Sequence, residues 1–595
     1  MAIPMQNSKH NRLASLTAII ITVLGTVFPN ASSAATRTVT SSLDTGAAGT
    51  LRAEIAAAAS GDTVQFASNL NGKTITLKLG QLVVDKSLTI AGPGVRNLTV
   101  SGNNKFRVFY VGGPGSSAGS AVTISGLAIT KGNGVGADLS GSGNGLNGGG
   151  LHNVGFLKLI RCAITSSKAL GSGGGIYNRG TLNEVTECTI AYNTAVANGG
   201  GVFDEQDMKI QRCAIYNNTA GGDGGGIQEG GTSVLINTTI ACNMAAGYGG
   251  GLNDAGGATI DLYNCTISGN TASIGGGLAV PFFGASTTLR NTIVAGNNPS
   301  GPPTPAPDVS DIFIDGTSGI LISAGNNLIG TTTGAGPGSF LPSDLLNANP
   351  KLGALKDNGG PTLTMALLPG SPAIDAGNNA NVLASMTTDQ RTYIARIIKA
   401  SAVNPATVDI GAYEYVESRD LKFDAVDLLT PLLPNKRVAN AIYYLNKSLN
   451  PTLWVDDTHL TMCGEDVFEY EEKAAKQLIY NCQYAGALSD AAINALDAMV
   501  TADEQLARAA IDEAVTAHGR AQDISRANSD LLKALGALSK QDYVGAIGFY
   551  EEAWKDAQKA MGRRCGHTHD CGHHCGHNGD DDDDGDHHSH GDHDD

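Results

Sequence analysis

Runs of three glycines recur through the middle of the chain at an almost constant interval. The runs begin at Gly148, Gly173, Gly199, Gly224, Gly249 and Gly275, with spacings of 25 or 26 residues. A second marker, a short piece such as CAI or CTI, recurs at nearly the same interval and ends at Ile164, Ile190, Ile215, Ile240, Ile267 and Ile293. Two independent markers in one register predict a solenoid whose coils stack on one another.

The residues between the glycine runs indicate which kind of solenoid to expect. They form short β-branched pieces, such as VTECTIAYN at residues 185–193, separated by Gly and Asn. No amphipathic run there reaches the length of a helix and no leucine framework is present, which disfavours helical and leucine-rich repeats. The pattern therefore predicts a mainly β fold, a right-handed single-stranded parallel β-helix with about 25 residues per coil and coils about 4.8 Å apart.

Stacked coils bring equivalent residues into columns. Cysteines two residues before the recurring isoleucines are expected as small buried hydrophobes beside the isoleucine column, at Cys162, Cys188, Cys213 and Cys265. Asparagines three residues after the isoleucines are expected to cap turns by bonding the backbone of the next coil, at Asn193, Asn218, Asn243 and Asn270. The glycines suit corners at which no Cβ is tolerated.

A solenoid needs a cap at each end. Residues 47–66 read AAGTLRAEIAAAASGDTVQF, in which Leu51, Ile55 and Ala58 share one helical face before a strand begins. We expect a short helix that closes the N-terminal end, followed by three or four early coils without the glycine run. The β-helix, with its cap and closing segment, is accordingly placed at residues 36–416.

Both ends of this region resemble known motifs. The piece GTLRAEI resembles the Cys-Ser-Leu-Arg-Glu-Ala start of many bacterial secreted β-helix proteins, without its Cys, and the glycine-run coils resemble polymorphic outer-membrane-protein repeats. Residues 349–378, followed by TDQR and VDIGAYEY, resemble the closing segment of the choice-of-anchor family of surface β-helices. Met365 replaces a frequent His and Thr392 a usual Gly, and the second difference predicts an altered turn. The resemblance implies export and architecture, and no single reaction.

Beyond residue 416 the chain changes from glycine-rich to helix-forming, and residues 417–562 are predicted to be an α-helical domain. Residues 529–561 are typical of a helical hairpin and resemble one tetratricopeptide-type unit. Its apolar and aromatic stripe is expected in the core, with a ligand groove as the alternative, at Tyr543, Ala546, Ile547, Tyr550, Ala553 and Trp554. Whether Cys463 and Cys482 form a disulfide is left open.

Residues 1–35 have the organisation of a secretory signal peptide. Basic residues precede an apolar run from Leu13 to Val27, and small residues lead to a cleavage site after Ala34 or Ala35. The run is shorter than the ~20 residues that a membrane-spanning helix needs, although an uncleaved anchor is the alternative. We therefore expect an exported chain that is extracellular or at the cell surface, with the periplasm as the other compartment.

Acidic residues recur three positions after the glycine runs. Asp204, Glu229 and Asp254 continue a column begun by Asn153 and Asn178, so three carboxylates would stack at the coil rise. Because β-helix lyases bind Ca²⁺ through acidic groups and related hydrolases use paired carboxylates, a catalytic or Ca²⁺ site on the β-helix is one interpretation. The column has no Lys or Arg, and we favour solvated turn residues without a catalytic role.

Residues 563–595 form a tail with an unusual density of metal-ligating side chains. From Cys565 onward it holds nine of the thirteen histidines and ten aspartates, with no Lys or Arg. Its few apolar groups predict disorder, because little surface can be buried to offset the entropy of ordering. Thiols and imidazoles suit Zn²⁺, Cu²⁺ or Ni²⁺ in several loose sites. The expected ligands are Cys565, His567, His569, Cys571, His573, His574, Cys575, His577, His587, His588, His590 and His593.

These features favour a non-enzymatic, exported surface or matrix protein, whose β-helix contacts surfaces or polysaccharide and whose tail binds transition metals. A polysaccharide lyase or glycoside hydrolase is the first alternative, and an extracellular metal-scavenging protein is the second. The expected partners are polysaccharide or cell-surface components. The net charge of −17, of which the aspartates of the tail supply −10, gives no basis for nucleic-acid binding.

Overall fold

The structure is a computed structural model, and it describes residues 34–113, 121–134, 145–180, 183–281, 284–299, 310–315, 319–333, 335, 339–394, 407–462, 464–485 and 490–563. Residues 1–33 of the expected signal peptide, Cys463, the side chain of Cys482 and the expected metal ligands of the tail lie outside this description. The chain divides into two compact units. The first comprises residues up to 210, 215–233 and 243–259, and the second comprises residues 211–214, 234–242 and those from 260 onward.

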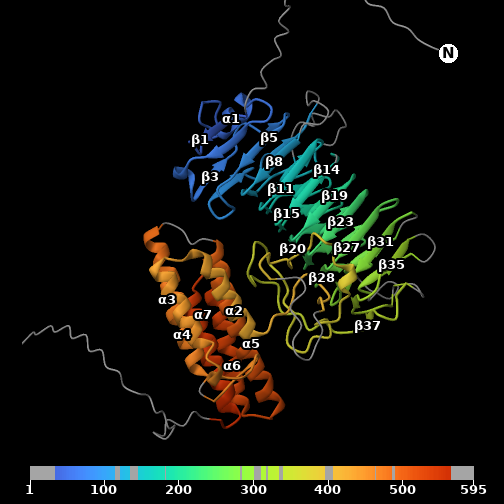
Figure 1. The fold of residues 1–595 in the computed structure, drawn as a ribbon. Coiled ribbons are helices and arrows are strands. Elements are labelled where there is room, and N and C mark those ends of the chain that lie inside the picture. The colour runs from blue at the N-terminus through green and yellow to red at the C-terminus, as the bar shows by residue number, and fades with distance from the viewer. Residues whose placement is uncertain are drawn as a thin grey trace, which may run out of the picture. The chain divides into compact units, whose positions relative to one another are not determined.

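A β-solenoid of about nine parallel turns forms the N-terminal part of the chain (Figure 1). The first sheet runs β1 (Thr36–Val39), β2 (Thr63–Phe66), β5 (Leu88–Ala91), β8 (Ala121–Ser125), β11 (Phe156–Ile160), β15 (Asn183–Thr186), β19 (Met208–Gln211), β23 (Thr232–Ile236), β27 (Thr259–Tyr263), β31 (Ser286–Arg290) and β35 (Ile320–Ser323). The second runs β4 (Leu82–Val84), β7 (Phe109–Val111), β10 (Leu151–Asn153), β14 (Ile176–Asn178), β18 (Val202–Asp204), β22 (Ile227–Glu229), β26 (Leu252–Asp254), β30 (Leu278–Val280) and β34 (Ile312–Ile314).

Two further parallel sheets complete the coils. The third runs β3 (Lys73–Thr76), β6 (Leu98–Ser101), β9 (Ala128–Thr130), β12 (Ala163–Thr165), β16 (Thr189–Ala191), β20 (Ala214–Tyr216), β24 (Thr239–Ala241), β28 (Thr266–Ser268), β32 (Ile293–Val294), β36 (Leu328–Ile329) and β37 (Leu345–Leu346). The fourth runs β13 (Lys168–Ala169), β17 (Thr194–Ala195), β21 (Thr219–Ala220), β25 (Met244–Ala245), β29 (Thr271–Ala272) and β33 (Asn298–Pro299). The predicted parallel β-helix is confirmed.

The predicted register holds across the coils. Val202 pairs with Ile227, which pairs with Leu252 in the following strand of the second sheet. The recurring isoleucines are all fully buried: Ile164, Ile190, Ile215, Ile240, Ile267 and Ile293. The four cysteines are buried beside them as free thiols: Cys162, Cys188, Cys213 and Cys265. Both core columns are therefore confirmed, and no helix occurs in the described part of residues 150–295.

The glycine runs form tight corners. The first glycine of each run has a φ between 63° and 69°, a left-handed conformation that residues with a Cβ rarely adopt. The second glycines lie directly against the backbone of the next coil. A Cβ added to Gly200 would lie 2.5 Å from the carbonyl oxygen of Gly225, and one added to Gly225 would lie 2.4 Å from that of Gly250. The expectation that no Cβ is tolerated at these corners is confirmed.

The asparagine column is a buried ladder of hydrogen bonds. The backbone N–H and the side-chain Nδ2 of Asn193 each donate to Oδ1 of Asn218 at 3.0 Å, and Nδ2 of Asn218 donates to the carbonyl of Ile190 at 2.9 Å. Asn218 repeats both contacts to Asn243. Each asparagine thus bonds backbone and side chain in neighbouring coils, which extends the predicted turn-capping role. In the second unit the same pattern links Asn270 to Asn297.

A short helix closes the N-terminal end of the solenoid, as expected. Helix α1 (Leu51–Ala57) buries Leu51 and Ile55, and the hydroxyl of Thr50 accepts a hydrogen bond from the backbone N–H of Ala53 at its start. Arg52 fixes the helix to the preceding loop, because its Nε donates to Asp44 at 2.7 Å. The helix therefore combines an apolar inner face with a capped N-terminus.

The closing segment does not continue the sheets. In the second unit it folds back along the outer side of the third sheet, a path that local sequence patterns do not reveal. The side chain of Gln390 accepts from the hydroxyl of Thr239 at 2.8 Å and donates to the carbonyl of Cys213 at 3.1 Å. The backbone N–H of Ala412 donates to Thr266 Oγ1 at 3.0 Å. The segment therefore covers strand residues of β24 and β28.

The DQR motif forms the buried centre of the closing segment. The Nε of Arg391 donates to Asp389 at 2.7 Å, and its guanidinium lies 3.7 Å from the ring centroid of Tyr413. Thr392, which follows, has a φ of 76°. This left-handed conformation is unfavourable for a β-branched residue, so Thr392 occupies a turn that suits the glycine usual in the resembling family.

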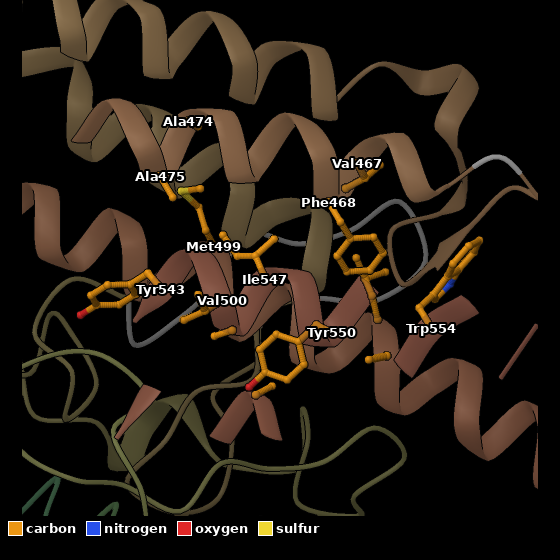
Figure 2. Close-up of a cluster of buried hydrophobic side chains, with 14 of the residues drawn as sticks. Val467, Phe468, Ala474, Ala475, Met499, Val500, Tyr543, Ile547, Tyr550 and Trp554 are labelled. Atoms are coloured by element: carbon orange, nitrogen blue, oxygen red, sulfur yellow. The ribbon is translucent and has the colours of Figure 1, made fainter. Parts of the chain in front are cut away.

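The C-terminal part of the second unit is a bundle of helices (Figure 1). It comprises α2 (Ser418–Leu429), α3 (Lys436–Ser448), α4 (Glu465–Ala485), α5 (Asp490–Thr516), α6 (Ala521–Leu538) and α7 (Tyr543–Ala560), with a small hairpin of β38 (Trp454–Asp456) and β39 (His459–Leu460). Short 3₁₀ helices cover Ser68–Leu70, Asn379–Asn381, Thr430–Leu432 and Pro451–Leu453. Tyr543, Tyr550 and Trp554 are buried against α4 and α5 (Figure 2), which confirms the core role of the aromatic stripe.

One charged group lies at the centre of the bundle. The ammonium of Lys422 on α2 donates to Glu471 on α4 and to Asp503 on α5, both at 2.7 Å, and all three side chains are fully buried. Burial raises the pKa of Asp503 well above its ordinary value, and the neighbouring Glu471 raises it further. The group links three helices through its hydrogen bonds. Removal of one partner would leave a buried charge uncompensated and would destabilise the bundle. None of the described helices combines the length and hydropathy of a membrane span.

Replacement of Asn218 by Ala should strongly destabilise the solenoid. The change leaves two donors of Asn193 and the carbonyl of Ile190 buried without partners, and each costs ~1–3 kcal/mol. We expect the free energy of unfolding to fall by about 3–5 kcal/mol in chemical denaturation. Thr219→Ala, at a partly exposed neighbour, is the control and should change it by less than ~1 kcal/mol. Equal losses of unfolding free energy in both variants would contradict a stabilising role of the asparagine ladder.

Candidate functional site

The acidic column proposed from the sequence does form. Its members are the last residues of β10, β14, β18, β22 and β26, namely Asn153, Asn178, Asp204, Glu229 and Asp254. Asn178 pairs with Asp204, Asp204 with Glu229, and Glu229 with Asp254 in the parallel register of the second sheet. All five residues lie in the first unit, so the three stacked carboxylates belong to one compact unit.

The column lies inside the solenoid. Asp204, Glu229 and Asp254 are each 0% exposed, whereas Phe203, between Val202 and Asp204, is partly exposed. Successive side chains of a strand point to opposite faces, so Asp204 shares the inner face with Val202. The interpretation of these acidic residues as solvated turn residues is therefore wrong, because the strand extends to the acidic residue before the turn begins.

Hydrogen bonds from amides and a hydroxyl satisfy part of the column. Nδ2 of Asn153 donates to Oδ1 of Asn178 at 2.7 Å, and Nδ2 of Asn178 donates to Oδ1 of Asp204 at 2.5 Å. Glu229 accepts from the hydroxyl of Ser233 at 2.6 Å and from the backbone N–H of Gly231 at 3.0 Å. Among the described residues, none donates a hydrogen bond to the second oxygen of Asp204. This arrangement leaves Asp204 and Glu229 as adjacent buried acids.

Burial favours the protonated forms of both acids. Removal from water raises the pKa of Asp204 to about 6, against a smaller lowering by the hydrogen bond from Asn178. Burial also raises the pKa of Glu229 well above its usual value, and the neighbouring Asp204 carboxylate raises it further. The charge of the nearby Asp207 raises the pKa of Asp204 further. The pair therefore retains a proton where exposed carboxylates would have lost theirs.

The column cannot act on a polymer in this arrangement. A general acid or nucleophile must come within hydrogen-bond reach of the scissile bond, and these carboxylates have no accessible surface. In the described part of the chain, no group of three or more His, Cys, Asp and Glu side chains is arranged to hold a metal ion. What the geometry supports is a proton-carrying structural column.

A second set of polar groups, missed by the sequence analysis, lies on the outer side of the same strands. The rings of His152, Tyr177 and Phe203 follow one another at 4.9 and 5.2 Å between centroids. The hydroxyl of Tyr177 donates to the carboxylate of Glu205, which accepts from Nε of Arg179 at 2.8 Å. A spacing of 25 and 26 residues between the three rings was the available sequence signal.

The outer group is not arranged as a general base. Burial raises the pKa of Tyr177 strongly, and the hydrogen bond to Glu205 raises it further, so the phenol keeps its proton. Arg179 and Glu205 neutralise one another and are partly exposed. The group therefore stabilises the outer surface by stacking and ion pairing, and it presents a guanidinium–carboxylate pair to the surroundings.

Comparison with known proteins supports the fold assignment. Residues 114–298 match the family model of a right-handed beta helix region. This part of the chain resembles right-handed β-helix proteins. The match covers the turns with the glycine runs and the acidic column, and it leaves the resemblance to the choice-of-anchor and polymorphic outer-membrane-protein classes a prediction. A search of curated proteins found no match to the chain.

The buried acids should make the solenoid less stable as pH rises. Burial raises the folded-state pKa of Asp204 from 3.8 to about 6, so its contribution to stability is complete below about pH 4 and is lost as pH rises through about 6. The pKa of Glu229 is also raised, so its contribution changes in the same direction. We expect the free energy of unfolding to fall by roughly 2–3 kcal/mol between pH 4 and 8. Chemical denaturation across this pH range measures the change.

Asp204→Asn should reduce this pH dependence and raise stability at pH 8, because an amide keeps the acceptor for Asn178 and carries no charge. Asp85→Asn is the matched control at an exposed position away from the column and should retain the slope. A pH profile of Asp204→Asn that matches the unsubstituted protein would contradict the protonated column.

Proposed function

We propose that this chain is an exported surface or matrix protein without enzymatic activity, in which the β-helix is a scaffold for contact with polysaccharide or surfaces and the tail binds transition metals. The observation that carries the non-enzymatic part is the burial of Asp204, Glu229 and Asp254. Lyases and hydrolases on such folds need carboxylates that reach the substrate. Here the stacked carboxylates support the interior of the rod instead.

The outer surface of the first sheet offers a regular contact face. Thr36, Thr63, Thr89 and Thr123 occupy paired positions in β1, β2, β5 and β8, and all four are at least partly exposed. Neighbouring hydroxyls are therefore separated by one coil, about 4.8 Å. A row of donors and acceptors at a fixed interval suits a ligand that repeats its hydroxyl groups, and a polysaccharide is such a ligand.

The proposed metal-binding role of the tail rests on its donors. Thiolate and imidazole groups are the ligands that Zn²⁺ and copper prefer, and nearby aspartates add attraction for any cation. The donors follow one another closely along the chain, so binding requires no preformed pocket. Export, which the N-terminal segment predicts, would place the tail where it meets extracellular metal ions.

The protein should not cleave acidic polysaccharides. Incubation with polygalacturonate and other uronate polymers should yield neither unsaturated products nor new reducing ends, because the carboxylates are enclosed. The measurements are ultraviolet absorbance and a reducing-end assay. Turnover that disappears in Asp204→Asn or Asp254→Asn would replace the scaffold proposal with a lyase or hydrolase. Retention on a polysaccharide column without turnover is the expected result.

The tail should take up several Zn²⁺, Cu²⁺ or Ni²⁺ ions while the solenoid stays folded without metal. Calorimetry on the mature chain and on a version that ends at Arg564 should show uptake by the longer chain alone. Affinity should fall as pH drops through ~6.5, because imidazole must be neutral to ligate. Chelators should leave thermal unfolding of the solenoid unchanged, since its stability comes from coil stacking. Equal uptake by both versions would assign the metal to another part of the chain.

A further inference from the structure

Aromatic and basic side chains gather on the outer side of helices α3 and α4. The residues are Tyr443, Tyr444 and Lys447 of α3 with Tyr470 and Lys473 of α4, called here the tyrosine–lysine face. The ammonium of Lys447 lies 4.8 Å from the ring centroid of Tyr443 and 5.5 Å from that of Tyr470. Lys473 lies 5.4 Å from the same Tyr470 ring. The two helices therefore contribute to one continuous surface.

The same pattern continues along the two helices. The guanidinium of Arg437 on α3 lies 4.0 Å from the ring centroid of Tyr480 on α4, and it donates to Gln477 at 3.0 Å. Residues three or four apart on a helix share one side, so the spacing of Tyr443 and Lys447, and of Tyr470 and Lys473, aligns these side chains along the seam. The face is thus an extended stripe of cationic side chains that lie close to tyrosine rings.

The tyrosine–lysine face is open to solvent. Tyr443 is 55% exposed and Tyr480 is 41% exposed, which is unusual for aromatic residues of a helical bundle. A hydrogen bond with the Tyr443 hydroxyl raises the pKa of Lys447, so this cation stays charged. Of the two lysines, Lys473 has an exposed acidic neighbour, Glu469, at 3.4 Å. A chain with a net charge of −17 therefore exposes a local basic and aromatic stripe.

We propose that the aspartate-rich tail of this same chain, residues 565–595, docks on the tyrosine–lysine face. The tail supplies ten aspartate carboxylates and no Lys or Arg, and five of the aspartates form the unbroken run Asp580–Asp584. A run of carboxylates complements a stripe of ammonium and guanidinium groups, and charge-assisted hydrogen bonds between them are stronger than neutral ones. The phenol hydroxyls of the face add donors between the cations.

The length of the chain permits this contact. Helix α7 ends at Ala560, and Arg563 still contacts Glu513 of α5 through hydrogen bonds of 2.9 and 2.8 Å. From there to Asp580 the extended chain reaches up to ~55–60 Å. The longest helix of the bundle, α5 with 27 residues, measures about 40 Å. The aspartate run can therefore reach along the full length of the bundle.

Covalent attachment favours the tail over other polyanions. A tethered segment meets the face at a local concentration of the order of millimolar, without a second molecule. A free anionic polymer must instead approach a protein whose net charge is −17, which slows association. Tethering and net charge therefore both favour the chain's own tail as the occupant of the face, and an external polyanion would compete with it.

Zero-length cross-linking with a carbodiimide tests the contact on the mature chain at low salt. Tail carboxylates should become linked to Lys447 and Lys473, as identified by mass spectrometry after digestion, and dilution should not reduce the yield. The links should decrease at least tenfold at ~1 M salt, where screening shortens the Debye length to about 3 Å. Lys540, an exposed lysine after α6, is the control and should be linked at least tenfold less. Equal yields at Lys447, Lys473 and Lys540 would overturn the proposal.

A competition experiment gives an independent outcome. Labelled polygalacturonate should bind the version ending at Arg564 at least fivefold more tightly than the mature chain, since truncation uncovers the face. Lys447→Ser with Lys473→Ser should remove that gain, and circular dichroism should show unchanged helix content. Equal binding by the mature and truncated chains would overturn tail docking. Because both measurements are made in metal-free buffer, their outcome is separate from metal uptake by the tail.

Discussion

The asparagine ladder is the interaction on which the rest of the β-helix depends. Tight turns leave backbone N–H and C=O groups inside the fold, and a buried group without a partner costs ~1–3 kcal/mol. Asn218 meets this requirement for Asn193 and Ile190 at once, and Asn243 does the same for Asn218. The ladder works only if consecutive coils keep one register. That register in turn aligns the isoleucines, the cysteines and the glycine corners, so a slip by one residue would disrupt all of these columns together.

The same register explains why three acids are stacked in an apolar interior. Parallel pairing places Glu229 between Asp204 and Asp254, and no basic residue enters that column in the described part of the first unit. Protonation and amide hydrogen bonds, rather than ion pairing, make the arrangement tolerable. A buried lysine solves the same problem in the helical bundle, where Lys422 lies between Glu471 and Asp503. The chain thus contains two solutions to burying carboxylates, and neither presents them to a ligand.

Much of this could be predicted because the β-helix repeats its local pattern. The glycine corners, the isoleucine core and the N-terminal helix follow from spacing and from the apolar face of Leu51 and Ile55. The prediction that Asp204 is solvated was wrong because it overlooked the alternation of side chains along a strand. Val202, two residues earlier, lies on the inner face, so Asp204 does too. The path of the closing segment could not be predicted from local patterns, because Gln390 forms hydrogen bonds with residues more than 150 positions away. At Thr392 the sequence located the position but did not reveal the conformation: the β-branched residue adopts the left-handed φ of 76° that suits glycine, and an altered turn stays a prediction.

Coils that make identical contacts on both sides are interchangeable units of length. A duplication of one 25-residue coil would reproduce every column and lengthen the rod by about 4.8 Å, so evolution can adjust its reach without redesigning a core. Coil length can vary without loss of pairing: Ile129 and Ile164 pair directly although 35 positions separate them, and the additional residues fall between β9 and β10. Unequal recombination between coils would therefore change the length of such a solenoid in steps of whole coils.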